Sequence, residues 1–204
     1  MQQSADEQLQ QAIDDIKEWL RDNDAESFIG QLAPGARAAD LDELEAALGA
    51  ALPAGLRQLY LLHDGQTGEI EPLFEHMRFL SVAEAAGSRA GMLDRYVIPP
   101  AGVALRDYHA RHDYVSDAEL LSPRWLPFAN TEGDFLAVQL DTGRVYRFSK
   151  GDLPWIHLEA PDFATFIGDY ASAIWDDVYQ FHGDPARPGV EDGLRWLGRY
   201  LSRA

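Results

Sequence analysis

One stretch of alternating residues constrains the fold more than any other part of this sequence. Residues 135–148 form two alternating runs around a central Asp-Thr-Gly, and a three-residue loop with glycine last is a common connection in a β-hairpin. This loop places Leu136 opposite Phe148 and Val138 opposite Tyr146, which gives the hairpin one wholly apolar face. A two-residue loop would set Val138 against an arginine and is rejected. The sequence therefore predicts an antiparallel sheet with one buried face.

A short helix is expected before the sheet, between Leu52 and Gly65. Pro53 has no N–H, and the first turn of a helix does not need one, so a proline suits this helix start. Leu56 and Leu59 recur at helical spacing. Gly65 follows the last periodic residues, where glycine tolerates a left-handed backbone. The segment predicts one helix that ends in a loop.

Two longer helical patterns precede this segment. Ser-Ala-Asp-Glu at 4–7 has the form of a capping box and begins a helix that is predicted to reach about Arg21. A similar signature at 40–43 begins a second helix, which ends near Gly49. Residues 28–39 contain two glycines and a proline and are predicted to be a connection.

Shorter signals lie around the hairpin. A strand is expected near 77–80, followed by one turn of helix over 81–86 with a serine cap. Residues 87–122 have poor periodicity and are predicted to be an irregular or partly helical insertion. Residues 125–129 are predicted to be the strand before the hairpin, whereas 155–158 is too short to assign.

The C-terminal part is predicted to be helical. Pro161 and Asp162 begin a long helix with a continuous apolar face. Glycines and prolines at 183–189 indicate a linker, and periodic apolar residues from Val190 to Leu201 predict one final short helix.

Composition narrows the class of protein. An apolar fraction of 46% over 204 residues argues against disorder, and no apolar run approaches the roughly 20 residues that a membrane span needs. The chain has no cysteine, which excludes disulfides and thiolate metal sites. These features and the absence of a signal-peptide pattern predict a soluble cytoplasmic protein.

The formal net charge of −17 is the strongest compositional signal. It opposes binding to nucleic-acid phosphates and to anionic lipid, because both need clustered lysine and arginine. A basic protein partner would be favoured instead. The acidity is equally consistent with a role in solubility alone, so both interpretations stay open.

The order of these signals resembles the SMI1/KNR4 (SUKH) superfamily. The resemblance rests on the Leu-Pro…His-Asp-Gly segment at 52–65, on residues 78–85, on 125–130 and on the hairpin that follows, and it covers about 37–178. It implies an α+β fold, in which helices pack against a twisted, mostly antiparallel sheet, with additional N- and C-terminal helices.

Length and resemblance together predict one domain with helical arms. We divide the chain into an N-terminal helical arm (1–36), an SMI1/KNR4-like domain (37–182), and a linker with a C-terminal helix (183–204) that packs on the same domain.

Three constellations suggest chemistry, and each has a structural explanation. His63 beside Asp64 resembles a base with its orienting carboxylate, but no nucleophile or phosphate-loop motif accompanies the pair, and a histidine at a helix end favours the helix dipole. The triplet at Asp141 resembles an aspartic-protease motif without its second copy. His109 and His112 lack a zinc-binding spacing. The sequence predicts no catalytic residue, metal or cofactor.

The resemblance implies a non-enzymatic binding module. Many bacterial members resemble immunity proteins, which neutralise a toxin, often a nuclease or deaminase, by binding it, and an acidic inhibitor can occupy a basic cleft. The principal alternative is a regulatory scaffold like the fungal members that act in cell-wall assembly. The candidate partner contacts are loop carboxylates and one possible aromatic anchor: Asp64, Glu132, Asp134, Asp141, Asp152 and Trp155. The same carboxylates are equally explained as a solvated rim.

Overall fold

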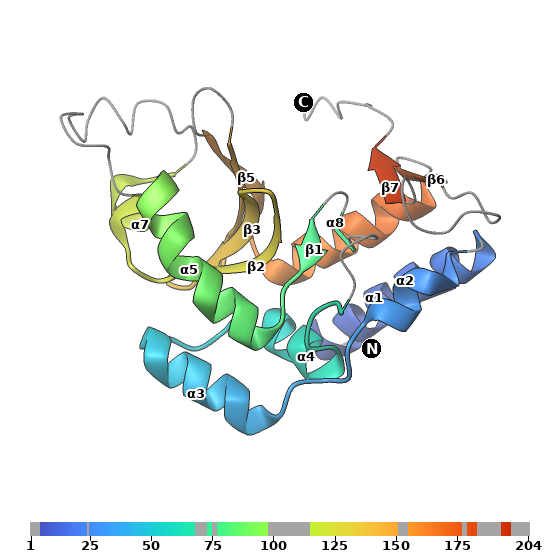
Figure 1. Cartoon of the computed structure of the whole chain (residues 1–204), viewed down its shortest axis with the longest axis horizontal. Helices are drawn as coiled ribbons and strands as arrows, with labels where there is room; N and C mark the ends of the chain where they lie inside the picture. The colour runs from blue at the N-terminus through green and yellow to red at the C-terminus, as the bar shows by residue number, and fades with distance from the viewer. Residues whose placement is uncertain are drawn as a thin grey trace.

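Helices lie on both faces of a five-stranded sheet (Figure 1). The structure is a computed structural model that describes residues 5–23, 25–67, 73–74, 77–97, 115–150, 155–176, 179–182 and 193–196, with the backbone alone at 5–6, 27, 117, 155, 179–182 and 193–196. The helices are α1 (Ala5–Asp22), α2 (Glu26–Gln31), α3 (Ala38–Leu48), α4 (Ala54–Leu62), α5 (Val82–Tyr96), α7 (Asp117–Leu121) and α8 (Phe163–Trp175). The strands are β1 (Arg78–Phe79), β2 (Trp125–Thr131), β3 (Asp134–Gln139), β4 (Val145–Ser149), β5 (Trp155–Ala160), β6 (Tyr179–His182) and β7 (Gly193–Trp196).

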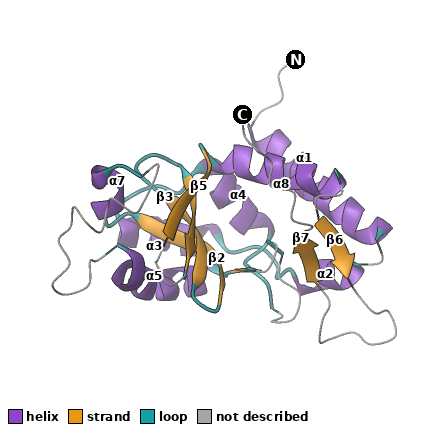
Figure 2. Ribbon diagram, turned by 90° about the horizontal axis from the view of Figure 1, so that it is seen from above, coloured by secondary structure: helices purple, strands orange, loops and turns teal. Residues whose placement is uncertain are grey.

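The large sheet is an antiparallel meander. Strands β1 to β5 pair in sequence order, each with its neighbour, while β6 and β7 form a separate two-stranded hairpin near the C-terminal end of α8 (Figure 2). Each connection joins adjacent strands, which is the simplest topology for an antiparallel sheet. The predicted α+β fold with an antiparallel sheet is confirmed, as are the strands expected near 77–80 and 125–129.

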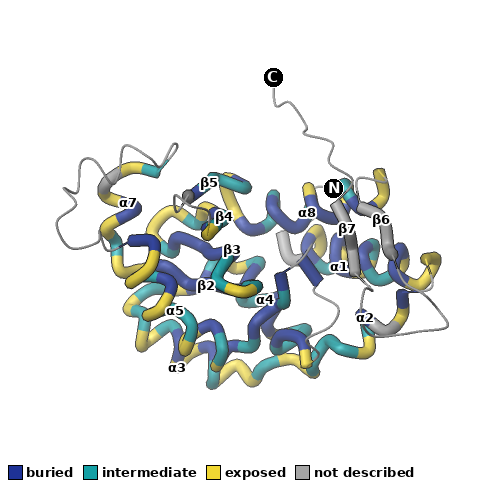
Figure 3. The backbone as a smooth tube through the Cα atoms, turned by 45° about the horizontal axis from the view of Figure 1, so that its top comes forward, coloured by how far each residue is buried: buried dark blue, intermediate teal, exposed yellow. Residues whose placement is uncertain are grey.

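Apolar side chains fill both faces of the sheet. One face packs with α1, α4 and α8 through Leu126, Phe128, Leu136, Val138 and Val145. The other packs with the C-terminal half of α5 and with α7 through Trp125, Phe135, Ala137, Tyr146, Phe148 and Ile156. The sheet is a buried central layer between two layers of helices, as the buried segments in Figure 3 illustrate.

The register of the hairpin differs from the predicted one. The observed pairs are Phe135–Phe148, Leu136–Arg147, Ala137–Tyr146 and Val138–Val145. The predicted pairs of Leu136 with Phe148 and of Val138 with Tyr146 are therefore wrong by one residue, and the loop covers 140–143, one residue longer than predicted. The prediction assumed that one face of the sheet would be polar, whereas helices cover both faces.

The first two helices match the prediction in part. α1 confirms the predicted helix to about Arg21, and its predicted cap at Ser4 lies outside the described residues. The connection predicted over 28–39 is wrong at its start, because α2 lies there and buries Phe28 completely. The glycine within this short helix concealed its helical pattern.

α3 begins two residues before its predicted cap. Arg37 flanks the helix start, so Asp40 lies in the first turn and accepts a 2.9 Å hydrogen bond from Arg37 Nε. No capping box forms at 40–43, and that part of the prediction is wrong. The predicted end at Gly49 is confirmed, with a left-handed φ of 63°.

α4 begins after Pro53 and ends before His63, as predicted. The predicted role of Gly65 as a left-handed helix cap is wrong in detail, because the residue that flanks the helix end is His63, in an extended conformation. Gly65 has φ 79° two residues later, and a Cβ there would lie 2.4 Å from the backbone nitrogen of Ser81. Gly65 is therefore needed for a close approach between two backbone segments.

The segment predicted to be an irregular or partly helical insertion begins as a regular helix. The capping box of Ser81 with Glu84 forms as predicted, but α5 continues to Tyr96 and not to 86. Residues 98–114 lie outside the described residues, and α7 follows them with its own capping box between Ser116 and Glu119. Glycines and an arginine within α5 interrupt the apolar pattern, which is why the sequence concealed its second half.

The C-terminal part contains one further correction. The long helix predicted from Asp162 is confirmed by α8, and Asp162 accepts a 2.8 Å hydrogen bond from the Thr165 N–H. Gly193–Trp196 form strand β7, so the helix predicted from Val190 to Leu201 is wrong over those residues. Two apolar residues at alternate positions also fit a strand. The predicted linker at 183–189 lies outside the described residues.

Candidate functional site

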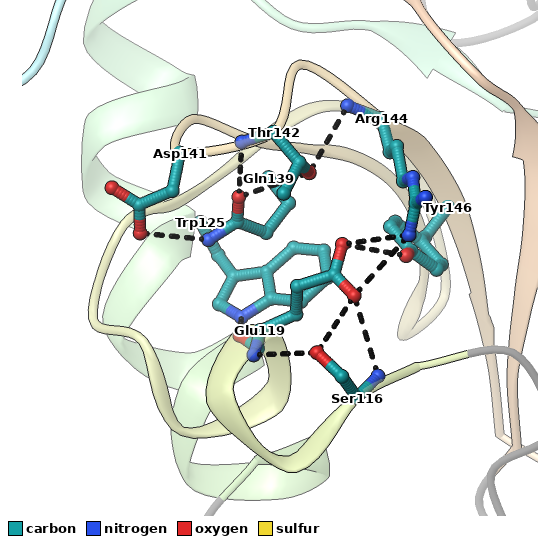
Figure 4. A network of polar contacts seen from close by, with 8 residues as sticks. All are labelled: Ser116, Glu119, Trp125, Gln139, Asp141, Thr142, Arg144 and Tyr146. Atoms are coloured by element: carbon teal, nitrogen blue, oxygen red, sulfur yellow. Dashed lines mark hydrogen bonds and ion pairs between the residues drawn. The ribbon is translucent and has the colours of Figure 1, made fainter.

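A network of polar side chains surrounds Glu119 where α7 meets the sheet (Figure 4). The carboxylate accepts hydrogen bonds from Ser116 Oγ at 2.9 Å, from Arg144 Nη1 at 3.2 Å and from the Tyr146 hydroxyl at 3.1 Å. The capping box of α7 brings Ser116 and Glu119 together, while β4 supplies Tyr146, and Arg144 lies just before β4. In addition, Trp125 Nε1 donates to the Glu119 carbonyl at 3.1 Å.

The network holds its charges fixed at neutral pH. Burial acts to raise the pKa of Glu119, but hydrogen bonds from Ser116 and Tyr146 outweigh it and lower that pKa below its usual value. Burial raises the pKa of Tyr146 to about 12. Glu119 is therefore an anion and Tyr146 a neutral donor across the physiological range. Neither group suits general acid–base catalysis, which works best with a pKa near the operating pH.

An open hollow of about 570 Å³ lies beside this network, and the candidate Asp141 lines it together with Glu119 and Arg144. Asp141 accepts hydrogen bonds from Ser122 Oγ at 2.6 Å, Arg124 Nη1 at 2.8 Å and Gln139 Nε2 at 3.1 Å. These bonds lower its pKa to about 2.

Glu119 and Gln139 are site residues that the sequence reasoning missed. Gln139 is fully buried, and its side-chain oxygen accepts the Thr142 N–H at 2.8 Å, which shapes the β3–β4 turn. A fully buried glutamine offers no distinctive sequence signal. Glu119, in contrast, follows Ser116 by three residues, which is the spacing of a capping box.

Glu132 and Asp134 lie together at the opposite end of β3, in the β2–β3 turn. Lys150 joins them: its Nζ donates to the Glu132 carbonyl at 2.6 Å and lies 3.4 Å from the Glu132 carboxylate, while its backbone N–H donates to Asp134 at 2.7 Å. The Glu132 side chain is 88% exposed and is thus available to a partner.

The remaining candidates lie elsewhere or outside the described residues. Asp64 follows α4 and accepts a 2.7 Å hydrogen bond from the Val82 N–H at the start of α5. Asp152 lies outside the described residues, and of Trp155 only the backbone is described, paired with Ser149. The candidates that are described therefore occupy three separate places and do not form one continuous patch.

His63 has a structural contact and no catalytic partner in the described part of the chain. Its Nδ1 lies 3.1 Å from the Ala33 carbonyl, and its Nε2 is buried without a hydrogen-bond partner. His109 and His112 lie outside the described residues. Among the side chains that are described, no three histidines or carboxylates converge on a possible metal site.

Charge is distributed unevenly along the chain. Residues 123–150, which contain β2 to β4, carry four basic side chains and three acidic ones. By contrast, α1 carries six acidic and two basic residues, and 159–176, which contain α8, carry four acidic residues and no basic one. α8 itself contains one acidic residue, Asp169, and α3 contains four with no basic one. The negative charge therefore lies on α1, on α3 and around the ends of α8, whereas the segment with the predicted sites at the ends of β3 is close to neutral.

Comparison with known proteins identifies the family. In the described ranges, no helix is both long enough and apolar enough to cross a lipid bilayer. The search of curated proteins finds no match. The SMI1 / KNR4 family (SUKH-1) matches residues 35–169, well over half of the sequence. The chain therefore belongs to the SMI1/KNR4 (SUKH-1) family.

Proposed function

We propose that this protein is a non-enzymatic immunity protein that neutralises a bacterial toxin by direct, stoichiometric binding. The observation that carries the proposal is membership of the SUKH family, which is a family of immunity proteins. The rigid, ionised network around Glu119 is consistent with this role, because it stabilises a binding surface without supplying a group that exchanges protons near pH 7.

The proposed partner is a basic toxin domain of the nuclease or deaminase type, in the cytoplasm. A nuclease needs a basic cleft for phosphates, and a protein with a net charge of −17 would associate with that cleft quickly through charge steering. Occlusion of the cleft would prevent access of the substrate without any chemistry on the toxin.

We propose the same candidate residues as contacts to the toxin, but they differ in how accessible their carboxylates are. Glu132 has the most favourable position, because its carboxylate is exposed and lies in a turn. Asp134 lies beside it. Asp64 and Asp141 already accept hydrogen bonds within the fold, so they would act mainly through their negative potential. Asp152 and Trp155 complete the proposed set.

The proposal is tested by searching the reading frame beside this gene for a nuclease-like or deaminase-like domain and by co-expressing that domain with the protein. We expect growth to be rescued, and a one-to-one complex to form at low salt and to weaken as salt rises. Glu132→Lys should weaken the complex more than Glu43→Lys, a matched charge reversal at an exposed residue of α3. Failure of the wild-type protein to rescue growth would contradict the proposal, and a complex without rescue would favour an adaptor role.

A further inference from the structure

A groove runs between α1 and α8, which lie side by side in both views (Figures 1 and 2). It has a volume of about 460 Å³. Its lining comes from both helices and from the residue that follows α8: Gln8, Gln11, Ala12, Asp15, Gly168, Ala171, Ser172, Trp175 and Asp176. Small residues form its floor, and a Cβ added at Gly168 would meet no atom within 4 Å. The groove therefore has room for a side chain from another molecule.

Trp175 lies at one end of this groove in a fixed orientation. Its side chain is 46% exposed, and it is the only exposed aromatic among the large apolar side chains of the described residues. Its Nε1–H donates to the Asp15 carbonyl at 3.2 Å, which holds the indole against α1. A ring that is already ordered loses little conformational entropy on binding, and tryptophan is enriched among the residues that dominate binding energy at interfaces.

The electrostatic surroundings of the indole favour a cation. Asp15 and Asp176 line the groove, and none of the described residues that line it is a lysine or an arginine. Trp175 is the last residue of α8, where the helix dipole adds partial negative charge, and the last turn of α8 contains no basic residue. The lysine of α1, Lys17, lies close enough to His63 to influence its pKa and does not line the groove.

We propose that the α1–α8 groove binds a basic segment of a protein partner, with an arginine or lysine side chain over the face of Trp175. Arginine stacks on indole rings through a cation–π interaction, and the flanking carboxylates of Asp15 and Asp176 complement its charge. Both α1 and Trp175 lie outside residues 35–169, the segment that matches the family. The inference rests on the proposed function only in naming the partner as a toxin.

A peptide of defined chemistry tests the groove without any toxin. The probe is a short synthetic peptide of arginine, glycine and one leucine, and its control has citrulline, which has a similar shape without the charge, in place of arginine. We expect the arginine peptide, and not the citrulline peptide, to shift the indole N–H resonance of Trp175 in a ¹⁵N–¹H spectrum. Trp175→Phe assigns that resonance.

Matched variants locate the binding. Trp175→Ala should weaken binding of the arginine peptide by about tenfold or more. Leu121→Ala, which truncates a similarly exposed apolar side chain on α7, should leave that binding unchanged. Asp176→Asn should weaken it more than Glu43→Gln. Gly168→Leu should block the groove, while Gly91→Leu, at another helical glycine with open space around it, should not.

Three outcomes would overturn the proposal: equal binding of both peptides, full binding by Trp175→Ala, or a Trp175 resonance that moves with protein concentration, which would assign the groove to a second copy of the chain. The growth assay separates this inference from the proposed function. Rescue by Trp175→Ala at wild-type level would reject the groove as the toxin site and leave the immunity role standing, whereas absence of rescue by the wild type would reject the immunity role alone.

Discussion

Asp64 Oδ1 accepts a 2.7 Å hydrogen bond from the backbone N–H of Val82, so the second residue after α4 is hydrogen-bonded to the first residue of α5. This N–H is one of those that a helix leaves without an internal partner. The His-Asp-Gly signature therefore has a structural purpose in this chain: the aspartate caps the next helix, and the glycine allows the two backbone segments to touch.

Removal of this cap should destabilise the fold. Asp64→Ala should lower the free energy of unfolding by about 1–2 kcal/mol, because a capping oxygen is lost. Asp64→Asn keeps an oxygen acceptor and should cost less. Urea unfolding measures both. A normal unfolding curve for Asp64→Asn together with weakened toxin binding would instead support the partner contact proposed for this residue.

Gly65 should tolerate no side chain. Gly65→Ala places a Cβ 2.4 Å from the Ser81 nitrogen and imposes a left-handed φ on alanine, so we expect a loss of about 2 kcal/mol or more of unfolding free energy. Gly91→Ala in α5 is the control, since it meets open space and should stabilise the protein by about 0.5–1 kcal/mol. Equal stability of the two variants in thermal unfolding would refute this account.

Stability should fall on mild acidification because of His63. Burial and the charge of Lys17 lower its pKa below 6.5, against a raising effect of the hydrogen bond with Ala33. The unfolded chain then binds the proton more readily, so this stabilisation is complete above pH 6.5 and is lost as pH falls through the lowered pKa.

The pH experiment has an internal control. His63→Asn retains a donor for the Ala33 carbonyl but does not titrate, so its unfolding free energy should change less between pH 6.5 and about 5 than that of the wild type. Glu84 and Glu119 have pKa values lowered from 4.5, so their contributions are lost only at lower pH. Parallel curves for both proteins would show that His63 has no such effect.

Of the carboxylates that line the hollow, Glu119 should contribute most to the stability of the fold. Glu119→Ala leaves Ser116, Arg144 and Tyr146 without their acceptor, and we expect a loss of about 3 kcal/mol of unfolding free energy. Glu132→Gln, at an exposed carboxylate, should change stability by less than about 0.5 kcal/mol. Guanidinium unfolding followed by tryptophan fluorescence compares the two, and a stable Glu119→Ala protein would show that the network contributes little.

The parts of the fold that local chemistry determines could be predicted from the sequence. The cap at Ser81 and the helix start at Asp162 form as predicted, because each depends on groups within three residues of one another. The register of β3 with β4 could not be predicted in this way. Phe135 and Leu136 are both buried, on opposite faces, so alternation alone did not distinguish one register from the next.

The site was harder to predict because tertiary contacts assemble it. Glu119 and Arg144 are 25 residues apart, and only the packing of α7 on the sheet brings them to 3.2 Å. Loop position correctly suggested that Glu132 would be exposed. Loop position could not reveal that Asp141 is hydrogen-bonded to Ser122 and Arg124. Those two residues precede β2, whereas Asp141 follows β3, and only the pairing of β2 with β3 brings them together.

The packing of α1 along α8 has a practical consequence for anyone who trims this protein to its family boundaries. Leu9, Ile13, Ile16 and Leu20 belong to the same apolar cluster as Ile167 and Ile174. A fragment that spans 35–169 alone would lack α1 and the second half of α8. It would expose to solvent the apolar surface that these helices cover, and it should aggregate. In this chain the segment that matches the family is therefore shorter than the unit that shares one apolar core, and expression should begin upstream of α1.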